Sequence, residues 1–185
     1  EYKLLKNKKI FEFNFILQPS RFSIFEWINQ SILIDSSYNA APMSMKRVIE
    51  NTLFLKSRLY NDYKIIFCLW DLRELWEYEQ KEHENLALFL KNKYDKMFLV
   101  WKCMKKYFIP IIWDDKNIKH FSNSNILWQE LKEFLSKSND KYLILFKWSQ
   151  NTIFLEDAIK QVLKSPKDSQ KICRQDNFWI QKKSK

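Results

Sequence analysis

The sequence contains no glycine in 185 residues. Average usage would place about 13 glycines in a chain of this length. Glycine is the residue that adopts positive φ without strain, so a natural domain of this size is difficult to build without it. The absence also excludes the two glycine-rich turns that hold nucleotides, the Gly-x-x-x-x-Gly-Lys P-loop and the Gly-x-Gly-x-x-Gly dinucleotide turn.

Other absences narrow the class of protein. No run of about 18 apolar residues occurs, so we expect no membrane insertion. The first residues include neither Met nor the apolar region of a signal peptide, and we interpret the chain as a piece of a longer one. The three cysteines, Cys68, Cys103 and Cys173, form no Cys-x-x-Cys pair. Neither a disulfide framework nor a cysteine-rich zinc site is therefore expected, and a cytoplasmic location fits.

The composition is that of a folded domain with a basic surface. Hydrophobic residues make up 46% and aromatic residues 17% of the chain, which is enough for a buried core. The net charge of +10 would suit a nucleic-acid partner. Lysines scattered over solvated helix faces explain the charge equally simply, and we favour that interpretation.

Short apolar runs alternate with amphipathic segments along the chain. The runs predict strands at 22–28, 31–35, 63–69, 96–100, 109–112, 119–121 and 141–146. Helices are predicted from Pro42 onward and at 77–91, 123–135 and 155–163. In the helix at 123–135 we expect five side chains to face inward: Ile126, Leu127, Leu131, Phe134 and Leu135. This alternation predicts an α/β fold, a Rossmann-like and mostly parallel sheet with helices on both faces.

Polar residues follow three of the predicted strands, at 35–42, 70–77 and 147–151. Ligands of such sheets bind beyond the carboxyl ends of the strands. In the first segment, Asp35, Tyr38 and Asn39 crowd before a predicted helix N-terminus, whose free N–H groups favour anions. The alternative is a turn that only caps the helix.

These three segments resemble, in order and spacing, the C-terminal domain of the Mur ligases. The family patterns are Asp-x-x-Tyr-Asn-Ala-Asn-Pro-x-Ser-Met, Gly-Asp-Met-x-Glu-Leu-Gly and Lys-Gly-Ser-Arg. They correspond here to 35–45, 70–76 and 147–150. The first pattern is most similar to that of the members that add D-alanyl-D-alanine. Two departures, Ala41 in place of Asn and Gln150 in place of Arg, put a ligand contact at each position in doubt.

The resemblance implies a domain organisation and an activity. It implies a Mur ligase C-terminal domain at 21–165, a remnant of the preceding ATP-binding domain or a linker at 1–20, and a basic, frayed tail at 166–185. Mur ligases of this kind join D-alanyl-D-alanine to UDP-N-acetylmuramoyl-tripeptide through an acyl phosphate, in the cytoplasm. Their ATP and Mg²⁺ are bound mainly by the central domain. We therefore expect this chain to be inactive alone, to be monomeric and to bind no nucleic acid.

The resemblance also implies roles for individual residues. The nucleotide-facing residues would be Asp35, Tyr38 and Asn39, and the dipeptide-binding residues would be Asp71, Glu74, Lys147 and Ser149. Lys147 would meet a carboxylate or phosphate as a point charge. Alternatively, Asp71 and Glu74 only cap the following helix. No catalytic residue and no metal ligand is assigned to this chain, and His83 and His120 are expected to be structural.

The sequence leaves two other functions open and argues against a third. One is another Mur-type ligase or a folylpolyglutamate ligase, and a second is a non-enzymatic, basic α/β domain that binds nucleic acid. The third, a nicotinamide-dependent Rossmann domain, lacks its glycine-rich turn even when Trp is allowed to stand for Gly. A P-loop encoded upstream of Glu1 would favour the ligase.

Five tryptophans fall where the Mur ligases have glycine: Trp27, Trp70, Trp76, Trp101 and Trp148. The UGA codon specifies Gly in some bacterial lineages and Trp in other codes. We hypothesise that many of these Trp residues are Gly in the source organism. A protein that is truly rich in Trp and free of Gly is the alternative.

Overall fold

The computed structural model describes residues 18–112 and 116–148, with the isolated positions 159, 167, 168, 172, 173, 177 and 181. The predicted site residue Ser149 and the departure at Gln150 lie outside the described residues. Residues 1–17 of the remnant or linker predicted at 1–20, nearly all of the helix predicted at 155–163, and most of the tail predicted at 166–185 also lie outside the described residues.

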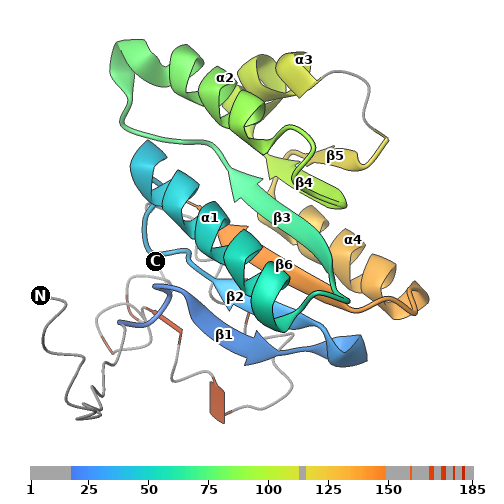
Figure 1. Cartoon of the computed structure of the whole chain (residues 1–185). Coiled ribbons are helices and arrows are strands. Elements are labelled where there is room, and N and C mark those ends of the chain that lie inside the picture. The colour runs from blue at the N-terminus through green and yellow to red at the C-terminus, as the bar shows by residue number, and fades with distance from the viewer. Residues whose placement is uncertain are drawn as a thin grey trace, which may run out of the picture.

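A six-stranded sheet forms the centre of the molecule (Figure 1). Its strands, in spatial order, are β1 (Ser23–Glu26), β2 (Ile32–Asp35), β6 (Tyr142–Lys147), β3 (Lys64–Trp70), β4 (Lys96–Val100) and β5 (Ile118–Phe121). Only β1 is antiparallel to its neighbour; the other pairs are parallel. The prediction of a mostly parallel sheet is confirmed.

Helices cover both faces of the sheet (Figure 1). One face carries α1 (Pro42–Leu59), α2 (Glu79–Leu90) and the pair η4 (Met104–Phe108) and α3 (Ile109–Ile112), and the other carries α4 (Ser124–Lys137). Two short turns of 3-10 helix, η2 (Ile28–Gln30) and η3 (Trp76–Tyr78), complete the described elements. No helix in the described part of the chain has both the length and the apolar character needed to cross a bilayer.

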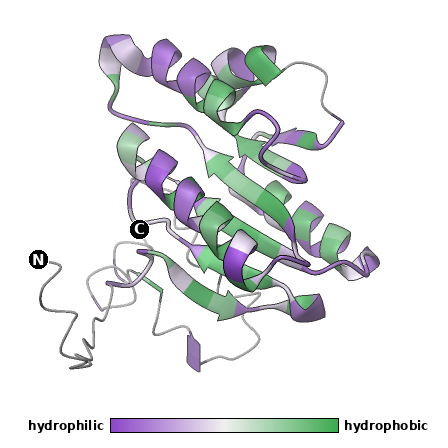
Figure 2. Ribbon diagram, in the orientation of Figure 1, coloured by the Kyte–Doolittle hydropathy of each residue, from purple (hydrophilic) through white to green (hydrophobic). Residues whose placement is uncertain are grey.

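Alternate residues of the central strands enter two separate cores. Phe67 and Leu145 pack on the α1 and α2 side, whereas Cys68 and Phe146 pack on the α4 side. The side-chain period of two in a strand sends neighbours to opposite faces, and both faces are covered here. The strands β3 and β6 are therefore apolar throughout their centres, as Figure 2 shows.

Two sequence predictions are wrong in detail. The segment Ile109–Ile112 is a helix continuing from η4, not a strand. Pro110 has no N–H to donate to a sheet ladder, which disfavours a strand at this position. On α4, Ile126 is 46% exposed and Trp128 is buried instead. The helix starts at Ser124, directly after the cap at Asn123, and this start fixes which side chains face the sheet. The buried residues of α4 are Ser124, Leu127, Trp128, Leu131 and Leu135.

Replacing the cap of α4 tests this account of its position. The Asn123 side chain accepts a hydrogen bond from the Ile126 N–H at 3.0 Å. We expect Asn123→Ala to lower the free energy of unfolding by about 1 kcal/mol, because one N–H of the first turn loses its acceptor. The matched control is Asn125→Ala, at an exposed position inside the helix, which should change stability by less than about 0.5 kcal/mol. Urea unfolding measures both variants, and equal losses would contradict the assignment.

Candidate functional site

The carboxyl ends of all five parallel strands lie along one edge of the sheet. In register, Asp35 of β2 pairs with Phe146 of β6, and Leu69 of β3 pairs with Lys147. The loops after β2 and β3 therefore leave the sheet on either side of the end of β6. Two of the three predicted segments are fully described there. The third is described as far as Trp148, the residue before Ser149.

Asp35, predicted to face a nucleotide, is fully buried. One carboxylate oxygen accepts the Ser37 N–H at 3.0 Å, and the other accepts the Ser20 hydroxyl at 2.5 Å. The Ser20 hydroxyl oxygen in turn accepts the Cys173 N–H at 3.1 Å. Asp35 thus links its own loop to Ser20 directly and to Cys173 through Ser20. Its buried hydrogen bonds stabilise the conformation of the loop.

Lys147 reaches the same loop. Its ammonium donates to the backbone carbonyls of Ser36, at 3.1 Å, and of Asn39, and the residue is only 2% exposed. Burial lowers the pKa of Lys147 to about 8; Asp35 opposes this shift and Arg21 adds to it. Sequence reasoning grouped Lys147 with Asp71 and Glu74, whereas its hydrogen bonds join it to the Asp35 loop.

Tyr38 and Asn39 are the accessible side chains of this loop. Tyr38 is 36% exposed, and the Arg21 guanidinium lies 4.0 Å from the centre of its ring. The Asn39 side chain accepts the Ala40 N–H at 2.6 Å. The N-cap residue of α1 is Ala41, whose side chain makes no capping hydrogen bond, so this loop does not act as the capped turn considered above. Arg21 was missed by sequence reasoning, because no local pattern connects a residue before β1 with the loop after β2.

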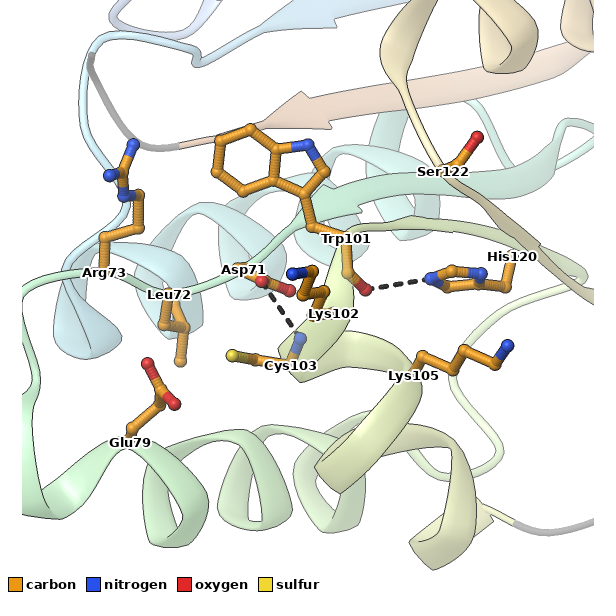
Figure 3. A pocket seen from close by; sticks show the side chains of 10 residues that line it. All are labelled: Asp71, Leu72, Arg73, Glu79, Trp101, Lys102, Cys103, Lys105, His120 and Ser122. Atoms are coloured by element: carbon orange, nitrogen blue, oxygen red, sulfur yellow. Dashed lines mark hydrogen bonds between the residues drawn. The ribbon is translucent and has the colours of Figure 1, made fainter. Parts of the chain in front are cut away.

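Asp71, predicted to bind a dipeptide, is 6% exposed at the end of β3. Its carboxylate accepts the backbone N–H of Cys103 at 3.0 Å, as Figure 3 shows. It also accepts the backbone N–H of Met104 at 2.8 Å. Asp71 therefore caps the helical turn that follows β4, not the helix that follows Asp71 itself. Glu74 lies on the exposed surface with φ of 60°.

A cavity of about 510 Å³ opens beside Asp71, at the ends of β3, β4 and β5 (Figure 3). The cationic side chains on its wall are Arg73, Lys102 and Lys105. The acidic side chains on the wall are Asp71 and Glu79. His120 donates through Nε2 to the Trp101 carbonyl at 2.8 Å. The excess of cations favours a carboxylate or phosphate group, and Glu79 offers an acceptor to an amine.

One cluster near the cavity has the residue types of a metal site. One ligand atom each from Asp71, His83 and Cys103 lies within 4.8 Å of the others. The Asp71 oxygens already accept two backbone N–H groups. His83, fully buried, accepts the Leu72 N–H at Nε2, so its Nδ1 carries the proton toward the Glu79 carbonyl. Burial, with Asp71 second, raises the pKa of the Cys103 thiol to about 12. The cluster does not fit a cation, and His83 is structural in this geometry.

The buried ammonium of Lys147 predicts a specific dependence of stability on pH. The pKa of Lys147 is about 8 in the folded chain, below the usual 10.5. Between pH 8 and pH 10.5 the Lys147 amine is therefore protonated in the unfolded chain and mostly neutral in the folded chain. The free energy of unfolding should therefore rise from pH 8 to pH 10.5 by on the order of 3 kcal/mol relative to Lys147→Met. Lys132→Met, at an exposed position on α4, is the control. Parallel pH profiles of the wild type and Lys147→Met would contradict the burial of the charge.

The capping role of Asp71 predicts a loss of stability that Glu74 does not share. In Asp71→Ala the N–H groups of Cys103 and Met104 lose their acceptor, and we expect a loss of about 1–3 kcal/mol in the free energy of unfolding. Glu74→Ala, on the exposed part of the same loop, should stay within about 0.5 kcal/mol. Urea unfolding distinguishes the two. A neutral Asp71→Ala variant would show that the cap contributes nothing.

Comparison with known proteins points to one family. The chain is 31% identical over 142 residues, 72% of its length, to UDP-N-acetylmuramoyl-tripeptide–D-alanyl-D-alanine ligase of Bacillus subtilis, and it spans 28% of the length of that ligase. No family model matches.

Solved structures agree on the fold. A crystal structure of MurF from Acinetobacter baumannii has a TM-score of 0.63 at 19% identity, over 77% of this chain and 30% of that one. The MurF ligase of Thermotoga maritima in complex with ADP has a TM-score of 0.54 at 23% identity, over 72% of this chain and 28% of that one. The sequence match and the shared α/β fold show that the chain belongs to the Mur ligase family and corresponds to its C-terminal domain.

Proposed function

We propose that the chain is the C-terminal, substrate-facing domain of an ATP-dependent ligase that joins D-alanyl-D-alanine to UDP-N-acetylmuramoyl-tripeptide. The observation that carries the proposal is the 31% identity to a ligase of that name. The order of the three strand-end segments supports it, as does their convergence on one edge of the sheet. The enzyme would act as a monomer in the cytoplasm.

The reaction requires a carboxylate to become an electrophile. Transfer of the ATP γ-phosphoryl group to the peptide carboxylate forms an acyl phosphate, the dipeptide amine attacks its carbonyl carbon, and phosphate leaves with the bonding electrons. The amine proton passes to a base or to water. The protein contributes mainly by positioning these groups and by offsetting their negative charge.

In this proposal the first half of the edge faces the nucleotide. Tyr38 and Asn39 are its accessible groups, and Arg21 beside Tyr38 supplies a cation. Asp35 and Lys147 act as positioning residues, because their hydrogen bonds hold the loop that carries Tyr38 and Asn39. A loop fixed in this way presents its exposed side chains in one geometry, which lowers the entropic cost of orienting a ligand.

The second half of the edge faces the dipeptide. Arg73 and Lys102 on the cavity wall would take its carboxylate, and Glu79 would hold its amine. Asp71 fixes the backbone at the end of the cavity through its two hydrogen bonds. Exposed Glu74, in the same loop, remains a candidate contact to the dipeptide. Ser149, next in the chain after Trp148, stays a proposed contact to the dipeptide carboxylate.

ATP and Mg²⁺ would be held mainly by a central domain. The buried carboxylates of Asp35 and Asp71 are engaged by N–H and O–H donors, so in the described part of the chain these two leave no open set of oxygens of the kind Mg²⁺ takes. The sequence contains no P-loop. The chain alone would therefore neither hydrolyse ATP nor form the amide.

A direct assay on the full-length protein encoded by the gene tests the proposal. We expect phosphate release from ATP only when UDP-N-acetylmuramoyl-tripeptide and D-alanyl-D-alanine are both present, and at least about 100-fold faster than with a single amino acid in place of the dipeptide. Release that requires a single amino acid, or a folate with glutamate, would show a sibling ligase instead. The 185-residue chain alone is the control and should be inactive.

A further inference from the structure

The backbone reaches positive φ at eight described residues, and two of them are Trp76, at 50°, and Trp101, at 83°. The described tryptophans are Trp27, Trp70, Trp76, Trp101, Trp128 and Trp148. Two of six is a high share, since only six of all the other described residues have positive φ. A bulky side chain there forces Cβ against the backbone, whereas glycine has no such clash.

The conformation at Trp101 is imposed from both sides. Its N–H donates to the Phe121 carbonyl at 3.3 Å, and its own carbonyl accepts the Lys105 N–H at 3.3 Å and the His120 ring at 2.8 Å. The end of β4 is thus fixed to the end of β5 and to the start of the following helix. The indole takes no part in these hydrogen bonds, so the strained φ follows from the fold and not from the side chain.

At Trp76 the described part of the chain covers little of the indole. The residue is 89% exposed at the start of η3, two positions after Glu74, which also has positive φ. An indole projecting into water from a left-handed backbone combines two unfavourable features.

Two comparisons limit which tryptophans the argument covers. Phe22 has φ of 68°, so a bulky residue can be forced into this region, and positive φ alone is not decisive. Among the described residues, the buried indole N–H groups of Trp70 and Trp148 have no hydrogen-bond partner, but neither has that of Trp128. Trp128 lies inside α4 and stacks on Phe146 at 4.6 Å and 10°. Glycine there would leave a cavity and weaken the helix.

We infer that positions 76 and 101 are glycine in the protein made by the source organism, encoded by UGA, and that position 128 is a true tryptophan, encoded by UGG. Two independent observations carry the inference: the chain has no glycine at all, and the two positions have a backbone that glycine suits. The inference rests on neither the family nor the proposed function.

The substitution would reshape the cavity described above. The Trp101 indole lies on the cavity wall, and the Arg73 guanidinium is 5.4 Å from the centre of its ring (Figure 3). With glycine at 101, the cavity would exceed its present volume of about 510 Å³, and Arg73 would be released from the indole. A ligand would gain direct access to the hydrogen bond between the His120 ring and the backbone carbonyl of residue 101.

The decisive experiment is tryptic mass spectrometry of the protein purified from its source, together with the DNA sequence. Trypsin separates the three positions into the peptides 74–81, 97–102 and 120–132. We expect glycine masses in the first two peptides, a tryptophan mass in the third, and the codons TGA, TGA and TGG. A tryptophan mass in either of the first two peptides, or TGG at either codon, would overturn the inference.

A second experiment needs no source material. We expect the double variant Trp76→Gly/Trp101→Gly of the 185-residue chain to have a Tm higher by roughly 3 to 8 °C, because backbone strain is relieved at two positions. Trp128→Gly is the matched control and should lower the Tm by at least about 5 °C. A double variant with a Tm at or below that of the Trp form would contradict the claim that the fold requires glycine there.

Discussion

The site depends on the parallel pairing of β2, β6 and β3. Parallel strands end at the same edge, so residues more than a hundred positions apart become neighbours without any local signal. Lys147 at the end of β6 is in register with Leu69 of β3, and its ammonium reaches the loop after β2. This ammonium is almost completely desolvated, and its burial is tolerated because two carbonyls accept hydrogen bonds from it and Asp35 lies nearby. Loss of this pairing would leave a buried cation without partners, which ties the geometry of the loop to the integrity of the sheet.

The two acidic residues that end strands β2 and β3 share a physical role. Asp35 and Asp71 are both buried, and both use their oxygens to accept hydrogen bonds from their own chain. Polar residues at the ligand-binding edge of an α/β sheet thus need not touch a ligand. They fix the loops that carry the exposed Tyr38 and the half-buried Arg73. A motif can consequently contain both kinds of residue, and only the structure separates them.

The sequence allowed most of the sheet to be predicted, because strands buried on both faces consist of continuous apolar runs. It misassigned 109–112, where an equally apolar run forms a helix, since hydrophobicity alone does not separate a short buried strand from a buried helical turn. The partners of Asp71 and Lys147 could not be predicted, because they are backbone groups brought near by strand order. The cavity was equally inaccessible to sequence reasoning, since its wall combines the ends of three strands.

The missing glycine and the strained backbone have the same physical cause, the need for positive φ where a strand turns into a helix. At the carboxyl edge a chain must turn from a strand into a helix within one or two residues, and Trp101 makes this turn directly after β4. Two of the six other described residues at positive φ are Asn29 and Asn92, the residue type that best tolerates this region after glycine. Tryptophan does not tolerate positive φ in this way, and the strained residue Trp101 is part of the cavity wall. If the fold was selected with glycine at this position, then the cavity seen here is narrower than the one that evolved, and its indole wall is not part of the ligand-binding surface.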